Sequence, residues 1–214
     1  MGDEILTNLK KAMREFNREG VISWAQKAVE GGVDPLTAIG ALTDVIQEVG
    51  DGFSRGDLFL PELIGAGSTM EAAMPILTAE LKRRGLQRKS LGTVIIGTVL
   101  GDIHSIGKDM VSTLLTASGF SVLDLGIDVK ADQFIAAVKE HKPNIVAMSA
   151  LLTTTAKEQK VVIEGLKKEN LREKVKVIVG GGAIDQPFAD SIGADGYAPT
   201  APEAVVLARK LLGL

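Results

Sequence analysis

Short runs of apolar and β-branched residues alternate with helical patterns over the second half of the sequence. The runs are 94–96, 120–125, 145–149 and 175–179, with a shorter one at 196–198. Helical patterns follow at 106–117, 131–141, 155–169, 187–192 and 202–212. Continuously apolar strands that alternate with helices are typical of parallel sheets covered on both faces. The sequence therefore predicts a doubly wound, five-stranded α/β domain of the Rossmann-like or flavodoxin-like kind.

The first 86 residues show helical periodicity instead. The first apolar stripe holds Ile5, Leu9, Met13 and Phe16. Glu19-Gly20 should end that helix, and further helices are expected at 21–30, 34–53 and 60–84. Four amphipathic helices with short connections predict an antiparallel bundle. The polar segment 87–90 separates the two patterns, which gives a helical domain over 1–88 and an α/β domain over 89–214.

Gly65, Ala66 and Gly67 lie in the middle of the fourth predicted helix. Each glycine there should lower helix stability by about 1 kcal/mol relative to alanine. Two interpretations account for them. Either neighbouring helices pack closely at this point, or a flat, bulky ligand lies against this face. Composition alone favours neither.

The composition narrows the function classes. The formal net charge is −3 and aromatic residues make up 4%, whereas nucleic-acid binding needs a basic surface and often aromatic stacking platforms. The absence of cysteine excludes disulfides, thiolate zinc sites and iron–sulfur clusters. The longest apolar run, Leu91–Gly101, is too short to span a bilayer, and the N-terminus lacks the pattern of a signal peptide. We expect a cytoplasmic protein without nucleic-acid or membrane partners.

Ligands of doubly wound sheets bind at the carboxyl ends of the strands, so the loops there are candidates for a site. These loops span 101–109, 149–155, 180–183 and 198–200. The first contains His104, one of two histidines in the sequence. The other, His141, lies at a predicted helix end beside Pro143 and is expected at the surface.

A single loop histidine is ordinarily a solvated side chain, but Asp102 changes this interpretation of His104. A metal-bound imidazole usually donates its second ring hydrogen to a carboxylate. Zinc needs three or four protein ligands, and no second histidine is in reach. If His104 binds a metal, the other ligands must therefore come with a cofactor, and a macrocycle meets that requirement.

One pattern spans three of these loops and reads Asp102-x-His104-x-x-Gly107, Ser149-x-Leu151 and Gly181-Gly182. It resembles the cobalamin-binding signature shared by methionine synthase, methylmalonyl-CoA and glutamate mutases, and corrinoid methyl carriers. The resemblance implies that His104 is the lower axial ligand of cobalt, in place of the cofactor's own dimethylbenzimidazole (the base-off/His-on form). It makes Asp102 the hydrogen-bond partner of His104. Thr155 stands where methionine synthase has a serine that completes this ligand triad.

The same resemblance places the whole first loop in the cofactor site: Gly101, Asp102, Ile103, His104, Ser105, Ile106 and Gly107. Gly107 would lie at a turn into a helix, where a side chain would obstruct. A groove for the freed nucleotide tail is expected to be lined by Ser149, Leu151 and Thr153. Gly181-Gly182 would let the tail pass close to the backbone, although a glycine pair alone is also typical of a tight turn.

The helical half indicates which members of this family the chain resembles. Val49–Leu63 resembles the helical cap of methionine synthase and of small corrinoid proteins, and Gly193–Ala198 also matches the small carriers. Such a cap shields the upper face of the corrin, which makes Gly65–Gly67 and Met70 candidates to lie over the methyl group. The resemblance covers essentially the whole chain. It implies the corrinoid protein of a methanol-, methylamine- or O-demethylase-type methyltransferase system.

A protein of this kind is expected to be a methyl carrier. Its cofactor would cycle between cob(I)alamin and methyl-cob(III)alamin, with methyl coming from a donor-specific methyltransferase. An acceptor methyltransferase that uses tetrahydrofolate or a thiol would receive it, and a reductive activator is a further expected partner. His104 should leave cobalt(I), while the Asp102–His104 pair takes up a proton. The joint near 86–90 should allow the helical bundle to swing.

Three other functions fit parts of the pattern. A cobalamin-dependent sensor would pair the same two domains with a DNA-binding segment, which this sequence does not show. A receiver-like signalling module needs an acidic cluster for magnesium. Asp124 and Asp128 could lie near Asp102, but His104 stands where a second carboxylate is expected. A nucleotide-binding domain would need a phosphate loop or Gly-x-Gly-x-x-Gly after the first strand, and none follows it.

Overall fold

The computed structural model describes residues 2–86 and 90–214, except the side chain of Ser54. The chain divides into two compact units, Met1–Lys89 and Ser90–Leu214. Most of the polar segment that is expected to act as a joint, residues 87–89, lies outside the described residues. No helix in the described part of the chain is long and apolar enough to cross a membrane.

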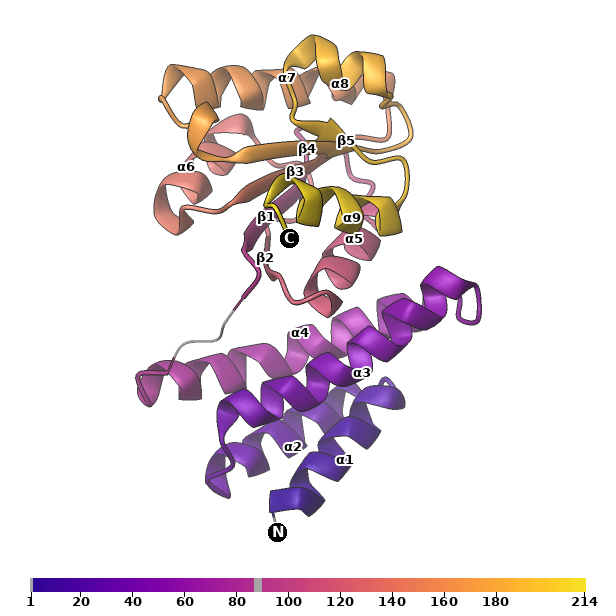
Figure 1. Ribbon diagram of the computed structural model, residues 1–214, viewed down its shortest axis with the longest axis vertical. Coiled ribbons are helices and arrows are strands. Elements are labelled where there is room, and N and C mark those ends of the chain that lie inside the picture. The colour runs from indigo at the N-terminus through magenta and orange to yellow at the C-terminus, as the bar shows by residue number, and fades with distance from the viewer. Residues whose placement is uncertain (1, 87–89) are drawn as a thin grey trace. The chain divides into compact units, whose positions relative to one another are not determined.

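Helices make up the described part of the first unit (Figure 1): α1 (Gly2–Arg14), α2 (Arg18–Glu30), α3 (Pro35–Arg55) and α4 (Leu60–Arg83). α2 and α3 both pack along α4, and α1 packs against α2 and α3. The buried residues recur at helical spacing, as Leu63, Ala66, Met70, Ala73 and Leu77 do in α4. The structure confirms the predicted four-helix bundle.

The connection between α1 and α2 differs from the prediction. α1 ends at Arg14, and Glu19-Gly20 lies in the first turn of α2. The reason is a cap: the side chain of Asn17 accepts a hydrogen bond from Gly20 N at 2.8 Å and so begins α2 early. Phe16 does not continue the helix, because its backbone is left-handed, with a φ of 52°. The predicted end of the first helix is therefore wrong by one turn.

Phe16 also explains one of the mid-helix glycines of α4. A Cβ atom added at Gly65 would lie 3.0 Å from Cγ of the Phe16 ring and 3.3 Å from its Cβ. The phenyl group thus occupies the space that a side chain at Gly65 would need. For Gly65, close packing inside the bundle accounts for the glycine, which is one of the two predicted interpretations.

The second unit contains a parallel sheet whose described strands follow the order β2-β1-β3-β4-β5. The strands are β1 (Thr93–Thr98), β2 (Ser121–Asp124), β3 (Ile145–Ser149), β4 (Lys176–Gly180) and β5 (Gly196–Tyr197). The helices are α5 (Ile106–Ala117), α6 (Ala131–His141), α7 (Thr153–Lys168), α8 (Gln186–Ile192) and α9 (Ala201–Leu211), with a 3₁₀ turn η1 (Arg172–Lys174). Helices α6, α7 and α8 cover one face and α5 and α9 the other (Figure 1). The structure confirms the predicted doubly wound fold.

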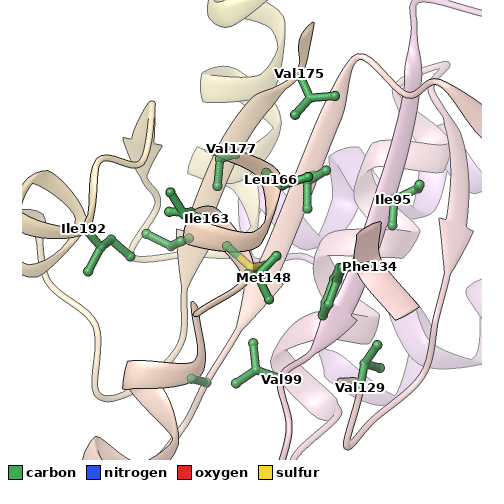
Figure 2. Close-up of a cluster of buried hydrophobic side chains, with 14 of the residues drawn as sticks. Ile95, Val99, Val129, Phe134, Met148, Ile163, Leu166, Val175, Val177 and Ile192 are labelled. Carbon is green, nitrogen blue, oxygen red and sulfur yellow. The ribbon is translucent and has the colours of Figure 1, made fainter. Parts of the chain in front are cut away.

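Alternate residues of each strand enter two separate core layers. Ile95 of β1 lies with Phe134 of α6 and Met148 of β3 in the layer under α6 and α7 (Figure 2). Its neighbours Val94 and Ile96 lie in the opposite layer, with residues of α5 and α9. Because successive side chains of a strand point to opposite faces, a strand buried on both sides must be apolar throughout. This is why the run at 94–96 shows no alternation.

Candidate functional site

The loops after β1 and β3 meet at the point where the strand order reverses. The last residues of these strands, Thr98 and Ser149, are register partners. From there β1 leads into α5 on one face of the sheet, whereas β3 leads into α7 on the other. Connections that diverge in this way leave room at the carboxyl edge, where ligands of such sheets bind.

A tight turn after β1 directs Asp102 inward and His104 outward. Gly101 has a left-handed φ of 78°, and the N–H of Asp102 donates to the carbonyl of Val99 at 3.1 Å. The hydroxyl of Thr98 donates to the carbonyl of His104 at 3.0 Å and so holds the far end of the loop. As a result Asp102 is 0% exposed, while the side chain of His104 is 47% exposed.

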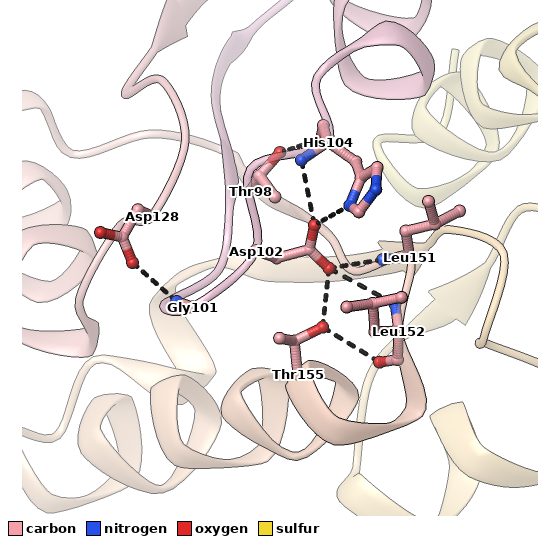
Figure 3. A network of polar contacts seen from close by, with 8 residues as sticks. All are labelled: Thr98, Gly101, Asp102, His104, Asp128, Leu151, Leu152 and Thr155. Atoms are coloured by element: carbon pink, nitrogen blue, oxygen red, sulfur yellow. Dashed lines mark hydrogen bonds and ion pairs between the residues drawn. The ribbon is translucent and has the colours of Figure 1, made fainter.

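The two oxygens of the Asp102 carboxylate bind different segments (Figure 3). Oδ1 accepts from the backbone N–H of His104 at 3.1 Å and lies 2.7 Å from Nδ1 of its ring. Oδ2 accepts from the N–H of Leu151 at 2.8 Å and from the hydroxyl of Thr155 at 2.6 Å. The N–H of Leu152 approaches the same oxygen at 3.4 Å. The carboxylate therefore connects the His104 loop to the start of α7.

Burial by itself raises the pKa of the Asp102 carboxyl, but the hydrogen bonds outweigh it. Donors from Thr155, His104 and Leu151 together hold the pKa well below that of an ordinary aspartate. Asp102 is thus a carboxylate at neutral pH, and a neutral His104 ring must carry its hydrogen on Nδ1 to bond with it. Nε2 then has a free lone pair, which is the form of imidazole that binds a metal.

The surroundings of His104 are apolar and open. Nε2 lies on the side of the ring away from Asp102 (Figure 3). The same loops expose large apolar side chains, namely Ile103, Ile106, Leu151 and Leu152. Among the described residues, no three His, Asp or Glu side chains gather as a metal site. If His104 holds a metal, the other ligands would come with a cofactor, and an apolar surface suits a flat macrocycle.

Gly107 differs from its prediction. It is the second residue of α5, and a Cβ atom added there would meet nothing within 4 Å. A side chain would therefore not obstruct the turn into the helix. Among the described residues nothing beside Gly107 requires a glycine, and its role in a cofactor site stays a prediction.

Gly181 and Gly182 lie against the loop after β3. Gly181 has a φ of 118°, and a Cβ atom on it would lie 2.0 Å from the carbonyl oxygen of Ala150. A Cβ atom on Gly182 would lie 2.7 Å from Cδ1 of Leu151. The close approach of the chain to itself already requires glycine here, as in a tight turn. A role in passing a nucleotide tail stays a prediction.

The remaining predicted residues lie in separate places. Ser149 ends β3 and is half-buried, Thr153 begins α7 and is exposed, and Ser105 precedes the first residue of α5. Met70 belongs to α4 of the helical unit and is 1% exposed. The ligand contacts of all four stay predictions, and Met70 could make one only after its side chain became accessible.

Several residues that contact the loop of Asp102 and His104 belong to no motif in the sequence. The hydroxyl of Thr98 donates to the carbonyl of His104, and the backbone N–H of Leu152 approaches the Asp102 carboxylate. Asp128 accepts a hydrogen bond from Gly101 N at 2.7 Å, whereas the sequence suggested it only as an acid of a receiver-like module. The sequence does contain one indication that Asp128 lies near this loop. Asp128 follows the second strand, and the second strand lies beside the first in doubly wound sheets.

Replacing Thr155 by valine should lower the free energy of unfolding of the second unit by about 1–2 kcal/mol. The change keeps the shape of the side chain but removes the hydroxyl that donates to the buried carboxylate of Asp102. Thr155→Ser keeps the hydroxyl and should lose less. Urea unfolding of the full chain, followed by circular dichroism, measures both. A valine variant as stable as the wild type would show that this hydrogen bond contributes nothing.

The chain matches two family models, each described as a B12 binding domain, over residues 92–206 and 5–78. It is 43% identical to the trimethylamine corrinoid protein of Methanosarcina barkeri, over 99% of this chain and 98% of that protein. It is also 43% identical to dimethylamine corrinoid protein 1 of Methanosarcina mazei, over 98% and 97%.

Solved structures agree with these relatives. The methanol:cobalamin methyltransferase complex MtaBC from Methanosarcina barkeri superposes with a TM-score of 0.82 at 32% identity, over 99% of this chain and 80% of that one. The monomethylamine corrinoid protein of the same organism superposes with a TM-score of 0.56 at 34% identity, over 99% and 100%.

Proposed function

The chain belongs to the family of B12-binding corrinoid proteins, and we propose that it carries methyl groups between two methyltransferases. The relatives named above are corrinoid proteins for trimethylamine and dimethylamine, and the structural neighbour is a methanol:cobalamin methyltransferase complex. A donor-specific methyltransferase would supply the methyl group. An acceptor methyltransferase would pass it to tetrahydrofolate or to a thiol, and a reductive activator would restore the cofactor after accidental oxidation.

The observation that carries the proposal is the exposed ring of His104, held by the buried Asp102 carboxylate among exposed apolar side chains. A corrinoid brings its own in-plane nitrogen ligands, so one axial ligand from the protein is enough. When bound, it supplies the cobalt atom that takes up and gives away the methyl group.

We propose that Nε2 of His104 is the lower axial ligand, which corresponds to a base-off/His-on cofactor. Asp102 fixes the hydrogen on Nδ1, orients the ring and raises the basicity of Nε2. Thr155 orients the carboxylate in turn. When the ring is not bound to a metal, the Asp102–His104 pair would be the place where a proton is held.

We propose cofactor contacts in each of the two units. Ser149, Leu151, Thr153 and the Gly181-Gly182 turn are candidates for the pocket of the nucleotide tail. The helical unit itself matches a B12 binding domain over residues 5–78, which supports a contribution of that unit as well. Within it, Met70 is proposed as a contact of the methyl-bearing face.

The proposal can be tested with protein that has been loaded with hydroxocobalamin and reduced. Each methyltransferase encoded beside this protein is added with trimethylamine, dimethylamine or methanol. One pair should convert the absorption spectrum to that of a methylated corrinoid, and an acceptor methyltransferase with tetrahydrofolate or a thiol should reverse the change. Methyl iodide serves as a chemical control. If methyl iodide methylates the bound cofactor but no enzyme–donor pair does, the carrier proposal fails.

A further inference from the structure

The loop between β2 and α6 runs alongside the loop that carries His104. The N–H of Thr98 donates to the carbonyl of Gly126 at 3.0 Å, and the N–H of Val129 donates to the carbonyl of Thr98 at 3.0 Å. Val99 and Val129 form an isolated parallel bridge. The pairing of β1 with its neighbour therefore continues past the end of β2, into the loop that leads to α6.

Asp128 binds this neighbouring loop on both sides of Asp102. Oδ1 of Asp128 accepts from the N–H of Gly101 at 2.7 Å, and the N–H of Asp128 donates to the carbonyl of Asp102 at 3.0 Å. Figure 3 shows the Asp128 carboxylate at Gly101, away from the His104 ring. One residue thus satisfies the peptide groups before and after the carboxylate that holds His104.

Both residues of this contact have unusual backbones. Asp128 has a φ of 55° and Gly101 a φ of 78°. Aspartate and asparagine enter this left-handed region more readily than other residues with a side chain, and glycine enters it freely. The contact therefore depends on two separable properties of Asp128, its left-handed backbone and its acceptor oxygen.

The position of the Asp102 carboxylate follows from the position of its backbone. Its two oxygens bind groups on opposite sides, the ring of His104 and the start of α7. Functional groups of this kind must be held within about 0.5 Å to work. A loop freed at Gly101 would let the carboxylate shift and would lose the orientation of the ring.

We propose that Asp128 is a positioning residue that holds the Asp102–His104 pair in the geometry required to bind cobalt. The proposal rests on the proposed function, since it concerns ligation of a corrinoid. Its hydrogen bonds go to the backbone of Gly101 and Asp102, and it would act on the ring through them.

Three substitutions separate the two properties of Asp128. Asp128→Asn keeps the acceptor oxygen and the left-handed backbone, Asp128→Gly keeps only the backbone, and Asp128→Ala keeps neither. Asp132→Ala, at an exposed position in the first turn of α6, is a matched control. Each protein is grown with nitrogen-15-labelled histidine and loaded with cob(II)alamin at one pH, and electron paramagnetic resonance measures the fraction whose cobalt shows coupling to nitrogen-15.

The asparagine variant and the control should match the wild type. In the glycine and alanine variants, the ratio of His-bound to His-free cofactor should fall by about tenfold, the lower end of the range for residues that orient a metal-bound histidine. A purely structural role would lower stability in urea without changing this ratio in folded protein.

Two results would overturn the proposal. A glycine variant with the wild-type ratio would show that the acceptor oxygen is not needed. Loss of coupling in the asparagine variant would show that the charge matters, not the contact with Gly101. If the glycine variant does not fold, hydrogen exchange in the wild type decides: the Gly101 amide should exchange as slowly as that of Thr98, and fast exchange refutes the contact.

If the proposed corrinoid function itself is wrong, the experiment gives a different result. That result would be a wild-type protein that binds no cobalamin or whose cobalt shows no coupling to a histidine nitrogen, and that outcome overturns both proposals. Coupling in the wild type that survives in the glycine variant overturns only the role of Asp128.

Discussion

Replacing His104 by alanine should weaken cobalamin binding by more than about tenfold and remove the coupling between cobalt and a protein nitrogen. Even the outer partners of a metal-bound histidine change metal affinity by roughly ten- to hundredfold, so loss of the ligand itself should do at least as much. Some affinity should remain, because exposed apolar side chains such as Ile103 and Leu151 would still offer the macrocycle an apolar surface. Quenching of tryptophan fluorescence or the absorption spectrum of the cofactor measures the binding.

His141→Ala is the matched control for this experiment. His141 is the second of the two histidines and ends α6, with a side chain that is 42% exposed. The His141 variant should bind cobalamin as the wild type does. Equal binding by the His104 variant and the wild type, with the same nitrogen coupling, would contradict the assignment of the ligand.

Replacing Asp102 by asparagine should lower the free energy of unfolding of the second unit by at least about 2 kcal/mol. Both carboxylate oxygens accept hydrogen bonds from N–H or O–H groups that are buried or partly buried. An amide offers only one oxygen, so its NH₂ group must face at least one of these donors in either orientation. Each buried donor left without a partner costs about 1–3 kcal/mol. The variant should also bind cobalamin with less nitrogen coupling, because the His104 ring loses its anionic partner.

The stability difference between this variant and the wild type should depend on pH. The folded protein holds the pKa of Asp102 below the ordinary aspartate value of 3.8, which applies to the unfolded chain. The stability that this shift contributes is fully present above pH 3.8 and is lost as the pH falls below it. Asparagine does not titrate, so the gap between the two proteins should narrow on acidification. Urea unfolding between pH 6 and pH 2.5, with Asp132→Asn as control, tests this. A gap that stays constant would mean that Asp102 is not the stabilised carboxylate.

The fold was largely predictable, because the apolar pattern determines it. Continuous apolar strands must be buried on both faces, and the run at 94–96 indicated this directly. The end of α1 was not predictable from periodicity, since a side-chain cap from Asn17 to Gly20 begins the next helix. The sequence leaves two interpretations of Gly65 equally open, because a contact between residues far apart in the chain leaves no mark on local composition. The position of the Phe16 ring in the structure favours close packing.

The contacts of the site that side chains make could be predicted from the sequence, whereas the contacts that backbone N–H groups make could not. Asp102 and His104 stand two residues apart in one loop, so their contact could be inferred from the sequence. The N–H groups of Leu151 and Leu152, which also bind the carboxylate, belong to residues whose side chains say nothing about it. Asp128 is the intermediate case, because its contact with Gly101 follows only once β2 is known to lie beside β1.

The claim that His104 binds cobalt is tested most directly by isotopic labelling. Protein grown with nitrogen-15-labelled histidine is loaded with cob(II)alamin and compared with unlabelled protein by electron paramagnetic resonance. The coupling pattern should change to that of nitrogen-15 in the wild type and in His141→Ala, and the histidine-derived coupling should be absent from His104→Ala. A pattern that is unchanged by the label would show that the axial nitrogen comes from the cofactor's own base, and would contradict the account.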